Sequence, residues 1–133
     1  MKMMKNAEAL KKLNAYTEQL IQKEIDGYSK EYKESKWYKK PTLKEVVGVP
    51  ILADIEAFQK ALESGICDIS HYVQTFEQAA SEYGSSWWYD DLGCERCGCE
   101  EETEIYIDLR NLAAETIGLK PVDWSDYYKG RGV

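Results

Sequence analysis

The residues of this chain best suited to chemistry are its four cysteines, three of which fall within residues 94–99. Cys94 and Cys97 form a Cys-x-x-Cys pair followed by glycine, a turn that presents two thiolates to one metal ion. Cys67 and His71 lie four residues apart, which on a helix places two further ligands on one face. We therefore predict a structural zinc site made by Cys67, His71, Cys94 and Cys97, in which Cys99 could replace any ligand. The alternative is that the thiols are free and Cys67 is a small core residue.

These residues give little support for catalysis. Cys67 and His71 could form an activated thiolate, but no third group that would orient the imidazole has a recognisable sequence signature. A redox role for the Cys-x-x-Cys pair lacks the alternating strands and helices that usually accompany it. The sequence also has no glycine-rich phosphate loop that opens a helix. We therefore predict that the protein is not an enzyme.

A second group of residues is suited to protein recognition. The chain has ten tyrosines and four tryptophans against two phenylalanines, and amphipathic rings are enriched in interfaces. Near the cysteines these rings adjoin several carboxylates. We predict that a partner binds there through Trp87, Trp88, Tyr89, Asp90, Asp91, Glu101 and Glu102. The alternative is that the rings close one end of a small core and the charges are only solvated.

Charge is distributed unequally along the chain, whose net charge is −7. Residues 1–48 hold 11 Lys and Arg against 7 Asp and Glu, a balance of +4, whereas residues 49–133 hold 6 against 17, a balance of −11. An acidic surface repels nucleic acid and anionic membranes and attracts basic proteins. We therefore predict a partner protein whose basic surface binds nucleic acid, and no direct contact of this chain with nucleic acid or membrane.

These observations favour a non-catalytic acidic binding protein. Small acidic proteins of phages or mobile elements often occupy the nucleic-acid site of a defence enzyme, a comparison that rests on size and charge alone. The sequence has no apolar run typical of a signal peptide, so we expect a cytoplasmic protein. The alternative function is a zinc-knuckle adaptor for nucleic acid or assembly that uses the lysine–aromatic stretch at residues 28–40. That stretch could also dock on the acidic half of the same chain or of a second copy, so a homo-oligomer stays open.

The elements that must position all these residues are helices. Apolar residues recur at helical spacing over about residues 6–28, 50–63, 68–84 and 104–118. Thr42 and Glu45 form a capping-box pattern that predicts a short helix through Val47. Residues 28–40 either extend the first helix or form a further short one. Gly65 and Gly84 mark two expected helix ends.

Residues 84–100 are predicted to form one long loop that carries the tryptophans, the acidic residues and the cysteines. The alternation at residues 104–108 also suits a short strand, but the helical period continues beyond it and favours helix. A chain of 133 residues suits one domain. We predict a single, mostly α-helical domain over residues 1–133, a small bundle of four to five helices with one long Trp/Cys/acidic loop.

Overall fold

Helices account for every regular element that the computed structural model describes, which covers residues 5–65, 68–90 and 99–122. The prediction of a mostly α-helical bundle is therefore confirmed. The strand alternative for residues 104–108 is wrong, because these residues lie inside a helix. The described helices are α1 (Asn6–Asp26), α2 (Lys30–Lys33), α3 (Leu43–Val47), α4 (Val49–Ser64), α5 (Ser70–Asp90) and α6 (Cys99–Thr116).

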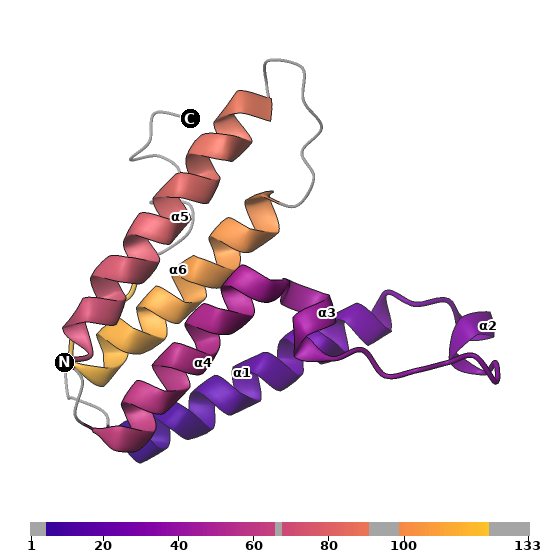
Figure 1. Cartoon of the computed structure of the whole chain (residues 1–133), viewed down its shortest axis with the longest axis horizontal. Helices are drawn as coiled ribbons and strands as arrows, with labels where there is room; N and C mark the ends of the chain where they lie inside the picture. Colours follow the sequence, from indigo (N-terminus) through magenta and orange to yellow (C-terminus); the bar gives the residue numbers. More distant parts are fainter. Residues whose placement is uncertain (1–4, 66–67, 91–98, 123–133) are drawn as a thin grey trace.

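The helices form two pairs with a projection at one end (Figure 1). Helices α5 and α6 lie side by side as an antiparallel hairpin, and α1 packs against both α4 and α6. The short helix α3 joins the pair by contacting α1 and α4. The lysine–aromatic stretch of residues 28–40, called the arm from here on, contains α2 and extends beyond the end of α1, away from the hairpin.

The core lies where these pairs meet, because each of the four long helices turns an apolar stripe inward. On α1 the buried positions are four residues apart and comprise Ala9, Leu13, Thr17 and Ile21. Aromatic rings join the other three long helices: the ring of Phe58 on α4 lies 5.4 Å from that of Phe76 on α5, which lies 6.1 Å from that of Tyr106 on α6. Tyr106 also hydrogen-bonds the carboxylate of Asp54 on α4. The core therefore holds the hairpin against the α1–α4 pair.

Several helix boundaries follow the predicted capping chemistry. The backbone N–H of Glu45 donates to Thr42 Oγ1 over 3.2 Å, and the N–H of Thr42 donates to Glu45 Oε1 over 3.1 Å. The N–H and the hydroxyl of Thr42 both donate to the carboxylate of Glu45, and these two bonds lower the pKa of Glu45. Helix α4 has proline in its first turn and ends at Gly65, whose φ of 66° suits a residue without a side chain. The capping box and the glycine end are thus confirmed.

The predicted limits of the long loop are wrong on both sides. Helix α5 continues through Gly84 to Asp90, and α6 begins at Cys99, five residues before the expected start at Glu104. One glycine inside a helix costs about 1 kcal/mol relative to alanine, which packing against a neighbouring helix outweighs. Glutamates at positions 100–102 favour the early start of α6, because carboxylates are stabilised near a helix N-terminus. Residues 91–98 of the predicted loop lie outside the described residues.

Two consecutive side chains of α6 hold the segment that follows it. The amide of Asn111 donates to the carbonyl of Val122 over 2.8 Å and accepts from the N–H of Val122 over 2.8 Å. Arg110 donates to Glu77 on α5 over 2.8 Å and to the carbonyl of Lys120 over 2.9 Å. Residues 120–122 are therefore fastened back along α6.

Candidate functional site

The hairpin brings most of the predicted partner-binding residues to one end. Trp87, Trp88, Tyr89 and Asp90 are the last four residues of α5, while Glu101 and Glu102 lie in the first turn of α6. Because α5 and α6 are antiparallel, these two groups share the end of the hairpin drawn at the top of Figure 1. Asp91 lies outside the described residues. For positions 83–90 and 99–101 the course of the helix is described but the side chains are not, whereas Glu102 is half-buried.

The predicted zinc site falls mainly outside the described part of the chain. Cys67, Cys94 and Cys97 lie there, and Cys99 is the first residue of α6. His71 is exposed on the first turn of α5, where its Nε2 lies 3.4 Å from Thr75 Oγ1. Within residues 5–65, 68–90 and 99–122, no cluster of three or more His, Cys, Asp or Glu side chains is arranged to hold a metal.

Zinc binding therefore stays a prediction, and elemental analysis can test it. We expect close to one zinc per chain in protein purified without chelator, and loss of that zinc in Cys97→Ser. Equal metal content and equal stability in the two proteins would contradict a zinc site.

Four acidic residues of α6 recur at helical spacing, and two of them, Asp108 and Glu115, contact α1. Positions 101, 104, 108 and 115 are spaced by three, four and seven residues, so they follow one stripe of the helix. These positions are Glu101, Glu104, Asp108 and Glu115, and we call them the acidic stripe. Adjacent members are separated by about 4.5–10.5 Å along the axis, at 1.5 Å per residue. The stripe is therefore a line of negative charge that begins at the shared end of the hairpin.

Helix α1 engages the C-terminal half of the acidic stripe. The hydroxyl of Tyr16 donates to Asp108 Oδ2 over 2.7 Å, and Lys12 forms a 2.9 Å ion pair with Glu115. Burial raises the pKa of Tyr16 far above its ordinary value of 10.0, and the nearby charge of Asp108 and their hydrogen bond raise it further. Tyr16 therefore stays a neutral donor at physiological pH and acts as a fixed link between α1 and α6.

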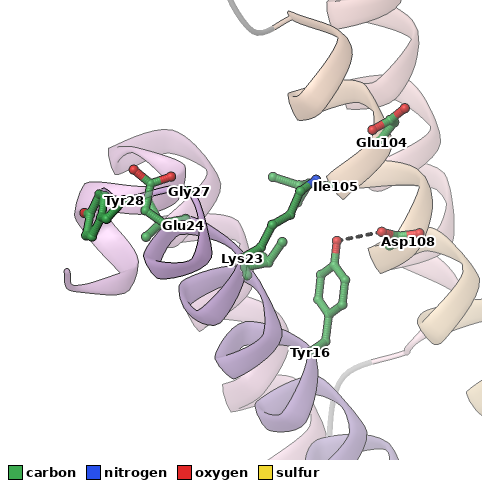
Figure 2. Close-up of a pocket in the computed structure, with 10 residues that line it drawn as sticks. Tyr16, Lys23, Glu24, Gly27, Tyr28, Glu104, Ile105 and Asp108 are labelled. Atoms are coloured by element: carbon green, nitrogen blue, oxygen red, sulfur yellow. Dashed lines mark hydrogen bonds between the residues drawn. The ribbon is translucent and has the colours of Figure 1, made fainter. Parts of the chain in front are cut away.

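A hollow of about 330 Å³ opens between α1 and α6 beside this link. Figure 2 shows Tyr16 reaching from α1 to Asp108, with Glu24 and Tyr28 at the other end of the hollow, where the arm begins. The hollow is lined by Tyr16, Leu20, Lys23, Glu24, Gly27, Tyr28, Val46, Glu104, Ile105 and Asp108. A second hollow lies on the other side of the Tyr16–Asp108 link and is lined by Lys12, Asn111, Leu112, Glu115 and Pro121 as well.

The lining of the first hollow combines apolar and acidic groups. Three carboxylates, those of Glu24, Glu104 and Asp108, stand against the single ammonium of Lys23. Apolar and aromatic side chains from α1, α3 and α6 supply the rest of the surface. Such a surface suits an aromatic or aliphatic side chain flanked by positive charge.

The arm presents the opposite chemistry. It carries five lysines and two glutamates, a balance of +3. The side chain of Trp37 is 75% exposed, and the Nζ of Lys36 lies 5.1 Å from the centre of its ring. Behind Trp37, the ring of Tyr32 packs edge to face against those of Tyr28 and Tyr38, at 5.2 and 5.6 Å between ring centres. The tyrosines thus brace a short projection that exposes a tryptophan among lysines.

The hollow was not predicted from the sequence. Tyr16 and Asp108 are 92 residues apart in the chain, so nothing local relates them. One signal was present, because Asp108 interrupts the apolar residues Ile105, Leu109 and Leu112 along α6. A carboxylate at such a position needs a partner from another element.

Comparisons with known proteins add no functional information. No model of a known protein family matches this chain, and no curated protein or solved structure matches it significantly. Among the described helices, none combines the length and the apolar character needed to span a membrane.

Proposed function

We propose that this chain is a non-catalytic cytoplasmic binding protein that engages a basic surface on a partner protein through the acidic end of its α5–α6 hairpin. The contact residues are Trp87, Trp88, Tyr89, Asp90, Asp91, Glu101 and Glu102, as the sequence predicts. The observation that carries the proposal is the antiparallel course of α5 and α6, which gathers the last turn of α5 and the first turn of α6 at one end.

The acidic stripe supports this proposal because it continues from that end along α6. Each strand of DNA carries one phosphate per ~3.4 Å of helix axis, and the stripe is a sparser row of the same sign. A protein surface that is built to hold a phosphate backbone has lysines and arginines in rows, which suits a row of carboxylates. The most specific form of the proposal is therefore an inhibitor that occupies a partner's nucleic-acid site, as some proteins of phages and mobile elements do.

The arrangement of charges also supports a partner at the N-terminal half of the stripe. Lys12 and Tyr16 on α1 contact Glu115 and Asp108, which are the two members of the stripe farthest from the shared end of the hairpin. Glu104 and position 101 lie one turn apart towards the shared end of the hairpin. A basic partner that approaches this end meets carboxylates from both helices.

A charge-reversal experiment tests the proposal with a fluorescent polyarginine peptide as the probe. Reversing Asp90, Asp91, Glu101 and Glu102 to lysine should weaken binding at least ~10-fold at physiological ionic strength, because close charge pairs dominate such contacts. Circular dichroism should report unchanged helix content. The matched control reverses four exposed carboxylates elsewhere, those of Glu8, Glu31, Glu56 and Glu63, and should lose much less affinity.

Equal losses in the two variants would contradict a defined acidic site, because they would reflect net charge alone. The same two variants can then be used as baits in affinity purification from the native host. The partner should be retained by wild type and by the control but not by the hairpin variant. If Trp88 anchors that partner, Trp88→Ala should weaken its binding by at least ~2 kcal/mol, or about 30-fold.

A further inference from the structure

The arm is a preformed projection that lies apart from its own hairpin. Ser29 caps α2 by accepting the N–H of Tyr32, and the hydroxyl of Tyr32 accepts the N–H of Lys39 across the turn. Together with the edge-to-face packing of Tyr28, Tyr32 and Tyr38, these bonds hold the arm without any fully buried residue. A preformed projection loses little conformational freedom on binding, which favours a docking role.

Two of the lysines in the arm are unpaired within the part of the chain that the structure describes. Lys30 and Lys40 lie within 4 Å of Glu34 and Glu18, respectively. Lys33 and Lys36, by contrast, have no carboxylate at ion-pair distance among the described residues. Both lysines precede the exposed Trp37, and the Nζ of Lys36 lies 5.1 Å from the centre of its ring. An exposed aromatic ring beside positive charge suits a partly apolar, acidic receptor.

The hollow between α1 and α6 is such a receptor, and it occurs on every copy of the chain. Its volume of about 330 Å³ is at the small end of the ~300–1,000 Å³ range of ligand pockets and suits one aromatic side chain. Leu20, Val46 and Ile105 give it an apolar part, while Glu24 and Glu104 lie among its carboxylates. The arm of the same chain extends beyond the end of α1, away from the hairpin (Figure 1). A second copy of the chain carries an arm of the matching charge and is the occupant that we infer.

We propose that two copies of this chain form a reciprocal dimer in which Trp37 of each copy enters the α1–α6 hollow of the other. Lys33 and Lys36 then lie near Glu24 and Glu104 of the second copy. The hollow and the arm adjoin one another at Tyr28, which lines the hollow and begins the arm. Because the two complementary surfaces are neighbours, one two-fold axis can satisfy both at once and close the assembly. Two such contacts also bury twice the area of one, and a stable dimer needs a large buried area.

Charge exchange between two variants tests the dimer by sedimentation velocity at low ionic strength. Wild type should sediment as a dimer that dissociates as salt rises. Lys33→Glu/Lys36→Glu should be monomeric, and Glu24→Lys/Glu104→Lys should be monomeric as well. An equimolar mixture of the two variants should regain the dimer, because each altered arm then meets a hollow of opposite charge. Trp37→Ala should weaken the wild-type dimer at least ~10-fold.

Matched controls separate local pairing from net charge. Lys11→Glu/Lys60→Glu and Glu56→Lys/Glu63→Lys change the net charge by the same amounts at exposed positions elsewhere, and both should remain dimeric. A monomeric wild type at low salt, or a mixture that stays monomeric, would overturn the dimer. The outcome is independent of the proposed partner, because Lys33→Glu/Lys36→Glu leaves the acidic end of the hairpin intact and should still bind polyarginine.

Discussion

The arm and the α5–α6 hairpin are built on different principles. The hairpin buries a continuous series of apolar residues from both of its helices, including Val73 and Phe76 on α5 and Leu109 and Ala113 on α6. The arm buries none fully and relies on three tyrosine rings, one capped turn and surface charge. Burial of apolar surface is the main source of folding free energy. The hairpin therefore contributes to the stability of the fold, whereas the arm depends on the fold and adds chemistry to it.

The two regions also differ in the sign of their charge. The arm has a balance of +3 and the region from residue 49 onwards has −11. Opposite charges on separate elements attract other molecules more than they stabilise their own chain, since exposed pairs contribute ~0–1 kcal/mol. Substitutions in the hairpin and core should consequently change stability, and substitutions in the arm should change association.

The largest expected effect comes from the core that supports the hairpin. Phe58→Ala removes a fully buried ring that contacts the rings of Tyr72 and Phe76. It should lower the free energy of unfolding by about 3–5 kcal/mol, because a cavity remains. The control is Trp37→Ala, which should change stability by less than ~0.5 kcal/mol in urea unfolding at high salt. Similar losses of stability in both variants would contradict the conclusion that the core stabilises the fold and the arm does not.

A smaller effect is expected at the link between α1 and α6. Tyr16→Phe should lower the free energy of unfolding by about 1–2 kcal/mol near pH 8, because Asp108 loses a partly buried hydrogen-bond donor. The pKa of Tyr16 is raised in the folded chain, so its contribution is complete below about pH 10 and declines as the pH rises further. Above pH 10 this group should lower the free energy of unfolding of the wild type by up to ~1.4 kcal/mol per pH unit. The phenylalanine variant lacks that loss, so urea unfolding at several pH values should show the two stabilities converging.

A smaller loss of stability is expected from substitution at Thr42, where the arm joins helix α3. Thr42 caps α3, the helix that follows the arm and contacts both α1 and α4. Thr42→Ala should reduce stability by about 1 kcal/mol in thermal unfolding, whereas Thr42→Ser keeps the hydroxyl and should retain most of the stability. A loss in the serine variant equal to that in alanine would mean that the cap is not the cause.

The smallest effect is expected where the arm touches α1 through charge alone. Lys40 and Glu18 are 3.7 Å apart, with side chains 61% and 68% exposed. Glu18→Gln should change the free energy of unfolding by less than ~0.5 kcal/mol, because exposed pairs are weakened by water and salt. A larger, salt-dependent change would show that the arm is held to the body more firmly than its contacts suggest.

Local patterns predicted most of the fold. The stripe on α1, the capping box at Thr42 and the glycine end of α4 depend on residues within a few positions of one another. The continuation of α5 through Gly84 did not follow from local propensity. It reflects the neighbouring helix α6, and a rule that weighs one glycine alone cannot include that neighbour.

The candidate sites were less predictable for the same reason. The acidic and aromatic residues around position 90 were visible as a composition, but their arrangement depends on how two helices pair. The hollow required Tyr16 on the first helix and Asp108 on the last to meet. Such a contact depends on the packing of the whole bundle. The only local sign of it in the sequence is Asp108, a polar residue among the apolar residues of α6.

The two hydrogen bonds between the Asn111 amide and the backbone of Val122, here called the clamp, should slow hydrogen exchange. The amide group of Asn111 makes the paired donor and acceptor contacts that a neighbouring strand would make. The N–H of Val122 is therefore covered although it belongs to no helix. In deuterium oxide this proton should exchange only when the clamp opens, whereas the N–H of Lys120, which has no partner among the described residues, should exchange at almost the rate of an open chain. The ratio of the two rates would measure how often the clamp opens.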